Sequence, residues 1–337
     1  MSSPRFRPLL QSGAVAPKGA YRLCGGPLWF DRGVLHQADQ TPEICSASDL
    51  PDLNLERLVA PRPPICGLEW SRPRLMGILN VTPDSFSDGG QHFSHENALK
   101  EARRMAAAGA DMIDFGGEST RPGAETVPAD EEARRVVPVI TALKKVGVHQ
   151  PISVDTRKAA VAAAAIEAGA DLLNDVSAFG YDQHMADLAR DTNVPLCLMH
   201  AQGEPGTMQD APQYEDVVLE IYEWFEALLA RCEARGIPRT RILVDPGIGF
   251  GKTLAHNLAL LRNLSIFHGL GAPLLVGVSR KRFIGAIGNE PDASARAPGS
   301  IAVALEALRQ GVQMIRIHDV KETRQAVSLW EALNGFD

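Results

Sequence analysis

Residues 106–120 read AAAGADMIDFGGEST, and the same arrangement returns as IEAGADLLNDVSA at residues 166–178 and as LRQGVQMIRIHDV at residues 308–320. Each copy joins the end of a helix, a glycine, a short apolar run and several polar residues. A glycine at this place is typical of a helix that ends in the left-handed conformation. A short continuous apolar run indicates a strand that is buried on both faces. The unit therefore predicts a helix that leads into a buried strand.

Eight apolar runs of this kind follow one another toward the C-terminus, with segments of helical spacing between them. They are LMGILN (75–80), DMIDF (111–115), PISVD (151–155), DLLND (171–175), VPLCLM (194–199), RILVD (241–245), PLLVGV (273–278) and QMIRI (313–317). Buried strands that alternate with helices are typical of a parallel sheet covered by helices. Eight such units agree with a TIM barrel, which has about 250 residues. A doubly wound sheet is the alternative, and it usually has fewer units of this regularity. We therefore expect an α/β fold, a TIM (β/α)8 barrel over residues 73–337.

Residues 1–72 form an N-terminal extension that is rich in proline and glycine and has no sustained periodicity. We expect it to be irregular or a small β appendage. Within it, YRLCGGPLWFDRG (21–33) could form a hairpin, because apolar stretches flank a Gly-Gly-Pro turn. The extension could pack on the barrel, cover its bottom, support dimerisation or have no fixed structure. It is too short and irregular to be a fused second enzyme.

Composition argues against several classes of function. The net charge of −7 is unlike that of a nucleic-acid binder. The five cysteines are scattered without a CxxC pair, which argues against a disulfide framework or a zinc site and favours a reducing compartment. The apolar run VAAAAIEAGADLL (161–173) contains acidic residues and is too short to cross a membrane. We expect a cytoplasmic protein with small-molecule partners and with no nucleic-acid or membrane partner.

The segment DPGIGFGKT (245–253) ends like a phosphate-binding P-loop. A P-loop needs a glycine five positions before the Gly of GKT, so that backbone N–H groups surround the phosphates. That position is Pro246, which has no N–H to donate. We therefore expect no nucleotide-triphosphate site here, and Asp245 becomes the residue of interest.

Polar side chains follow most of the predicted strands. They are Asn80, Asp155, Asn174, Asp245, Lys281, Arg316 and His318. The C-terminal ends of the strands carry the chemistry of a TIM barrel. Buried carboxylates and amides there need partners, and adjacent N–H donors of an amino-pyrimidine edge match a carboxylate. The alternative is that Asp155 and Asp245 pair with Arg157 and Lys281 for structure alone.

A second cluster combines RIHDV (316–320) with Asn80. Arg316 and His318 alternate with an apolar residue and so point to the same side. An arginine and an imidazole suit a diphosphate, and the oxygen of Asn80 suits Mg²⁺. Two glycine- and proline-containing loops, NVTPDSFSDGG (80–90) and GGESTRPGAE (116–125), could close over the site or be simple turns.

Eight segments resemble those of dihydropteroate synthase, in the same order. They are GILNVTPDSFSDGG, GGESTRPG, SVDT, LLND, MHAQGEPGTMQ, DPGIGFGKT, GVSRKRFIG and RIHDV. The resemblance runs from about Leu75 to the C-terminus, and Ala201 and Phe115 are small departures without a polar role. It implies a transferase of folate biosynthesis that joins 6-hydroxymethyl-7,8-dihydropterin diphosphate to 4-aminobenzoate. The products would be 7,8-dihydropteroate and pyrophosphate, with Mg²⁺ as cofactor.

The resemblance also implies roles for individual residues. The pterin would contact Asp155, Asn174, Met199, Asp245 and Lys281. The diphosphate would contact Asn80, Thr120, Arg121, Arg316 and His318, with Asn80 as the metal ligand. The aminobenzoate would contact Phe86, Arg121, Phe250, Ser279 and Lys281. The catalytic residues would be Asp84, Arg121 and Lys281. A homodimer through the helix at residues 296–310 is implied too, although its apolar positions fit packing on the barrel equally well.

The expected reaction begins with loss of diphosphate, which leaves a cation at the pterin methylene. Asp84 would shield this cation while the loops exclude water, and the arylamine would then attack it. A pterin-binding methyltransferase is an alternative, but it would have no use for SRK (279–281) or RIHDV. A non-catalytic scaffold is another alternative, and it should have lost Asp84, Thr120 and Arg121.

Overall fold

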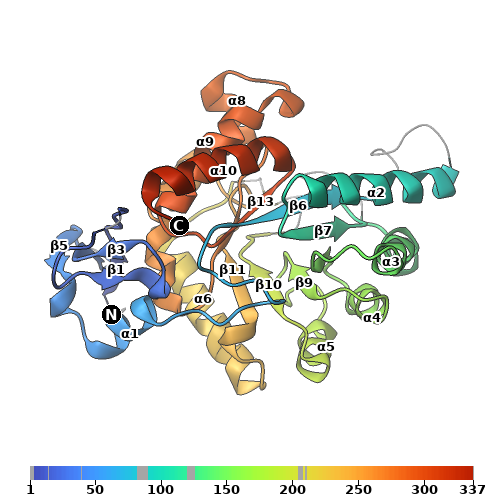
Figure 1. Ribbon diagram of the computed structural model, residues 1–337. Coiled ribbons are helices and arrows are strands. Elements are labelled where there is room, and N and C mark those ends of the chain that lie inside the picture. The colour runs from blue at the N-terminus through green and yellow to red at the C-terminus, as the bar shows by residue number, and fades with distance from the viewer. Residues whose placement is uncertain are drawn as a thin grey trace.

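The computed structural model describes residues 4–13, 15–38, 40–81, 90–119, 126–203, 208 and 211–336. In this part of the chain, eight parallel strands form one sheet in the order β11-β10-β9-β8-β7-β6-β13-β12 (Figure 1). A parallel bridge between Val244 and Leu274 joins the two outer strands. The sheet is therefore a nearly closed barrel, and the predicted TIM fold is confirmed.

All eight strands lie within two residues of their predicted bounds. They are β6 (Arg74–Asn80), β7 (Met112–Gly116), β8 (Ile152–Asp155), β9 (Leu172–Asp175), β10 (Leu196–Met199), β11 (Ile242–Asp245), β12 (Leu275–Gly277) and β13 (Met314–Ile317). The helices around them are α2 (Gly90–Ala107), α3 (Ala129–Lys145), α4 (Ala159–Glu167), α5 (His184–Thr192), α6 (Val217–Ala234), α7 (Leu254–Arg262), α8 (Arg282–Gly288), α9 (Ala297–Arg309) and α10 (Val320–Asn334).

The repeated glycines end helices as the sequence predicts. Gly109, Gly169 and Gly311 follow α2, α4 and α9 with φ angles of 96°, 109° and 81°. Glycine adopts this conformation without the steric cost that a side chain brings. Each helix can therefore turn directly into the next strand.

Apolar side chains fill the barrel at the N-terminal ends of the strands. This layer consists of Met76, Met112, Leu172, Cys197, Leu243, Leu275 and Met314, and Ile65 packs against it from the segment that precedes β6. Ile65 is 2% exposed. The end of the N-terminal extension therefore covers the bottom of the barrel, which directs the chemistry to the opposite end.

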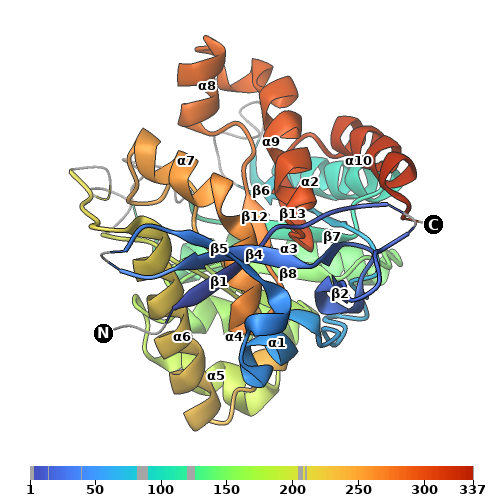
Figure 2. The same cartoon turned by 90° about the vertical axis from the view of Figure 1, so that its left-hand side faces the viewer.

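The N-terminal extension forms its own small sheets and packs on the side of the barrel (Figure 2). One sheet has three antiparallel strands, which are β1 (Arg5–Pro8), β4 (Arg32–His36) and β5 (Glu43–Ser46). The predicted hairpin forms a second sheet of β2 (Tyr21–Arg22) and β3 (Trp29–Phe30). The helix α1 (Asp52–Val59) follows β5.

Polar contacts fasten the extension to the barrel. Arg5 pairs with Glu226 of α6 at 2.7 Å, Ser265 Oγ donates to the Pro8 carbonyl at 2.9 Å, and Arg62 donates to the His268 carbonyl at 2.9 Å. The extension is thus a packed part of the structure.

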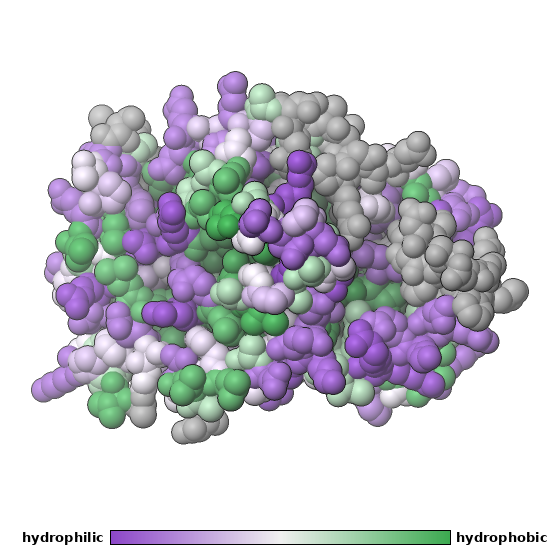
Figure 3. Space-filling model, turned by 90° about the horizontal axis from the view of Figure 1, so that it is seen from above, coloured by the Kyte–Doolittle hydropathy of each residue, from purple (hydrophilic) through white to green (hydrophobic). Residues whose placement is uncertain are grey.

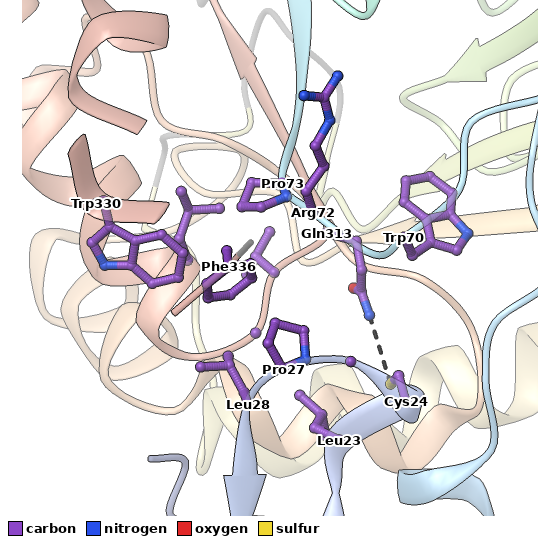
Figure 4. Close-up of a pocket in the computed structure, with 14 residues that line it drawn as sticks. Leu23, Cys24, Pro27, Leu28, Trp70, Arg72, Pro73, Gln313, Trp330 and Phe336 are labelled. Carbon is purple, nitrogen blue, oxygen red and sulfur yellow. Dashed lines mark hydrogen bonds between the residues drawn. The ribbon is translucent and has the colours of Figure 1, made fainter. Parts of the chain in front are cut away.

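A small pocket lies where the extension meets the last turn of the chain (Figure 4). The rings of Trp330 and Phe336 are 4.8 Å apart on one side of it, and the Gln313 amide donates to Cys24 Sγ at 3.7 Å on the other.

Over the face seen from above, hydrophobic side chains lie in small groups among hydrophilic ones (Figure 3). Among the described residues, no helix is long and apolar enough to cross a membrane.

Candidate functional site

The C-terminal ends of the strands bring the predicted polar residues together. Across neighbouring strands, Asn80 pairs in register with Gly116, Gly116 with Asp155, and Asp155 with Asn174. Met199 pairs with Asp245 farther round the barrel. Each of these residues stands at or next to the C-terminal end of its strand, so together they form the layer of side chains at the mouth.

Asp114 is the centre of a buried polar network below this layer. Its side chain has no solvent exposure. One oxygen accepts from Ser153 Oγ at 2.5 Å, and the other accepts from Asn174 Nδ2 at 3.1 Å and from Arg316 Nε at 2.6 Å. Sequence reasoning missed this residue. Strand alternation could have found it, because Asp114 lies two positions after the inward-facing Met112.

Arg316 joins Asp114 to Asp155 across the inside of the barrel. Its second nitrogen donates to Asp155 Oδ2 at 2.8 Å. Burial raises the pKa of Asp155 to about 7, and Arg316 opposes that rise. The suggested structural pairing of Asp155 with Arg157 is wrong. Arg157 instead pairs with Glu118. It lies beyond the end of β8, so the alternation of side chains along that strand does not direct it toward Asp155.

Hydrogen-bond acceptors line the floor of the mouth. In the described part of the chain, the buried Asp155 Oδ1 has no hydrogen-bond partner. Asn174 directs its nitrogen to Asp114, so its oxygen is left for another donor. Asp245 accepts from the backbone of Gly247 at 2.8 Å, and burial raises its pKa. Such acceptors fit a ligand that carries several adjacent N–H groups.

Lys281 and Phe250 border Asp245. The ammonium of Lys281 lies 4.3 Å from the centre of the Phe250 ring, a cation–π contact. Gly277 on β12 leaves space beside them, since a Cβ there would be 3.8 Å from Asp245 Oδ2. The pair therefore forms one wall of the mouth, with a charge at its edge.

Ser279 and His318 contact each other at the ends of β12 and β13. Ser279 Oγ accepts from the His318 backbone at 3.1 Å and lies 2.9 Å from His318 Nδ1. If the hydroxyl donates to Nδ1, the ring carries its proton on Nε2. Ser279 thereby fixes the orientation of the imidazole.

Asn80 ends β6 beside the open position of Gly116. Its side-chain oxygen is 3.5 Å from the place that a Cβ on Gly116 would take. Among the described residues, no group of three or more His, Cys, Asp or Glu side chains could hold a metal ion. A metal at this place would therefore need ligands from water or substrate besides Asn80, which is usual for Mg²⁺.

Four predicted site residues lie outside the described residues. They are Asp84, Phe86, Thr120 and Arg121. The described ends of the second loop meet at Glu118, which sequence reasoning also missed. Its carboxylate accepts from the Val127 backbone at 2.8 Å and from Lys158 at 2.6 Å.

The lysine of GKT does not face a phosphate site. Lys252 is 2% exposed, and its ammonium contacts His200 and the carbonyl of Phe250. Thr253 caps α7 through a reciprocal pair of hydrogen bonds with His256. The segment is thus a strand end, a tight loop and a helix cap, as expected from Pro246.

Comparisons with known proteins agree with this geometry. Residues 76–318 match the family model described as pterin binding enzyme. The dihydropteroate synthase of Escherichia coli strain K12 is 49% identical over 265 residues, which cover 79% of this chain and 93% of that protein.

Solved structures give the same result. The Xanthomonas albilineans dihydropteroate synthase with 4-aminobenzoic acid is 45% identical, covers 81% of this chain and 98% of that chain, and has a TM-score of 0.76. The same enzyme in complex with 7,8-dihydropteroate is 42% identical and has a TM-score of 0.72, and the match covers 79% of this chain and 95% of that chain.

Proposed function

Because this chain belongs to the dihydropteroate synthase family of pterin-binding enzymes, we propose a role in its reaction for each residue at the barrel mouth. The chain is a transferase of folate biosynthesis that condenses 6-hydroxymethyl-7,8-dihydropterin diphosphate with 4-aminobenzoate to give 7,8-dihydropteroate and pyrophosphate. The individual assignments below are supported by the acceptors, charges and spaces around the mouth.

The pterin lies on the floor of acceptors. The observation that carries this assignment is the buried Asp155 Oδ1 without a described partner, next to the oxygen of Asn174 and the carboxylate of Asp245. The pterin edge offers a 2-amino group and a ring N–H, which suit these acceptors. Met199 packs on the ring, and Lys281 donates to its carbonyl or nitrogen.

The diphosphate lies beside β6 and β13, where Asn80, Arg316 and His318 are, with Thr120 and Arg121 from the second loop. Arg316 already bonds two carboxylates, so its part is to keep positive charge near the phosphates while His318 donates from Nε2. Asn80 would hold Mg²⁺, which when bound neutralises charge on the leaving diphosphate. These donors spread the charge of the leaving group.

The aminobenzoate lies against the wall formed by Phe250 and Lys281, with Phe86 and Arg121 on its loop side. Phe250 offers an apolar face to the ring, and the cations suit its carboxylate. Ser279, which bonds His318, lies between this subsite and the diphosphate subsite.

The reaction proceeds by departure of diphosphate and attack of the arylamine on the pterin methylene. Asp84 shields the cation that forms, and the loops exclude the water that would trap it. No protein nucleophile takes part. The proton lost by the arylamine leaves with solvent or phosphate after the new C–N bond has formed.

The enzyme acts as a cytoplasmic homodimer on small-molecule substrates, without a nucleic-acid or membrane partner. Its five cysteines are all free, as a reducing compartment favours. On α10, which packs beside α9, Leu329 and Leu333 are 63% and 85% exposed and lie one turn apart. These side chains support a subunit contact at the α9 and α10 face, and light scattering would give the mass.

A change in the ligand tests the pterin assignment directly. Binding of 6-hydroxymethylpterin is compared with that of its lumazine analogue, in which oxygen replaces the 2-amino group. Loss of matched N–H donors against buried acceptors should weaken binding by roughly a hundredfold. Equal affinity for the two ligands would contradict the assignment of Asp155 and Asp245.

A further inference from the structure

Lys252 is a buried lysine that the reaction described above does not use. Its ammonium donates to the carbonyls of Phe250 at 2.9 Å and His200 at 3.2 Å, and lies 3.0 Å from His200 Nδ1. In its protonated form the side chain has three N–H donors, and these three acceptors use all of them. Lys252 therefore ties the end of β10 to the loop that follows β11.

The protonation state of His200 makes its imidazole a suitable hydrogen-bond acceptor. Burial, reinforced by Lys252, lowers the pKa of His200 to about 3, so its imidazole is neutral at pH 7. The ring is also packed edge-on against Trp224, with centroids 4.9 Å apart. Burial lowers the pKa of Lys252 itself to about 7, with Asp245 opposing that shift and Lys281 adding to it. His200 is thus a fixed point to which Lys252 attaches the loop.

Other contacts hold the loop at its flanks. Tyr214 donates its hydroxyl to the Gly251 carbonyl at 3.0 Å, and Asn257 Oδ1 accepts from the Gly249 backbone at 2.6 Å. Lys252 bonds the residue between these flanks, Phe250, whose ring lies over Lys281. A change at Lys252 would therefore tilt the peptide that carries this ring.

We propose that Lys252 is a positioning residue for the second substrate: it fixes Phe250 against the His200 backbone, so that Phe250 and Lys281 keep the spacing that the aminobenzoate ring requires. This inference rests on the proposed function, in which Phe250 borders the amine subsite. Lys252 itself touches neither substrate. Its effect should appear in the KM for the amine and leave pterin affinity unchanged.

The test measures two quantities on Lys252→Met, Lys252→Gln and the control Lys145→Met, which removes an exposed lysine in the last turn of α3. The KM for 4-aminobenzoate comes from steady-state turnover, and the Kd for 6-hydroxymethylpterin comes from calorimetry. We expect Lys252→Met to raise the KM about tenfold and to change the pterin Kd less than about threefold. Lys252→Gln retains two donors and should give a smaller rise, and Lys145→Met should change neither quantity.

Several outcomes would overturn the proposal. An unchanged KM in Lys252→Met would refute the positioning role, and so would equal rises in the KM and the pterin Kd, which indicate general damage to the barrel. If Lys252→Met does not purify as a folded protein, Lys252→Gln provides the same comparison. If the wild-type enzyme shows no amine-dependent turnover, the proposed function is refuted as well. If the wild-type enzyme turns over but the KM for the amine is unchanged in the variants, only the role of Lys252 is refuted.

Discussion

Replacement of Asp155 by Asn should weaken pterin binding strongly while leaving the fold almost intact. Asp155 is a buried acceptor with one oxygen on Arg316 and the other without a described partner. An asparagine must direct its NH₂ either at Arg316 or at the ligand, and in both orientations two donors face each other. A hydrogen bond to a charged group contributes about 1.5–3 kcal/mol, so binding should fall by roughly tenfold to more than a hundredfold.

Folding should respond much less than binding. The pKa of Asp155 in the folded protein is about 7, above its ordinary value of 3.8, because burial favours the protonated form. Stability from this group is therefore present at low pH and is lost as the pH rises from about 4 to 7. A neutral asparagine removes that pH-dependent loss, and Arg316 keeps its bond to Asp114.

The measurement is calorimetric titration with 6-hydroxymethylpterin, together with a thermal melt. Asp175→Asn is the matched control, because Asp175 is also a buried carboxylate, at the end of β9, and it accepts from the backbones of Ser177 and Phe179. The control should lower Tm without weakening pterin binding. Asp155→Asn with wild-type pterin affinity and wild-type Tm would refute the assignment of Asp155 as a ligand acceptor.

Three further results are expected. Pterin affinity should rise with pH up to about 7, where Asp155 becomes a carboxylate. Asp155→Asn should abolish that rise in a calorimetric pH series. The same dependence of affinity on pH in both proteins would assign the titration to another group. Gly247→Ala should destabilise the fold by on the order of 3 kcal/mol in urea unfolding, because a Cβ there would lie 1.9 Å from the His200 carbonyl at a φ of 70°. Gly147→Ala has a similar φ of 74° and no atom within 4 Å, so it should show only the smaller backbone cost, and equal losses in the two variants would rule out the clash. Asp84→Ala should reduce kcat far more than pterin affinity, as measured by turnover and calorimetry, and equal losses would count against shielding of the cation.

Much of the fold could be predicted from the sequence because each barrel strand is a continuous apolar run bounded by glycine or polar residues. Polar residues at strand ends were found for the same reason. The ion pair of Arg316 with Asp114 and Asp155 could not be, since it joins residues 202 and 161 positions apart and exists only once the barrel closes.

The role of Lys252 was hidden for a similar reason. Its partner His200 lies 52 positions away, directly after β10, and the letters GKT alone indicate a phosphate loop. Glu118 also gave no signal, because a carboxylate in a loop is usually solvated, whereas here Arg157 and Lys158, just before α4, pair with it.

The reaction itself is tested most directly by pyrophosphate release from the purified wild-type enzyme, given 6-hydroxymethyl-7,8-dihydropterin diphosphate and Mg²⁺ with and without 4-aminobenzoate. We predict release that depends on the amine, with one dihydropteroate formed for each pyrophosphate. Tight pterin binding without amine-dependent release would contradict the account, because the floor of acceptors would then serve a different reaction.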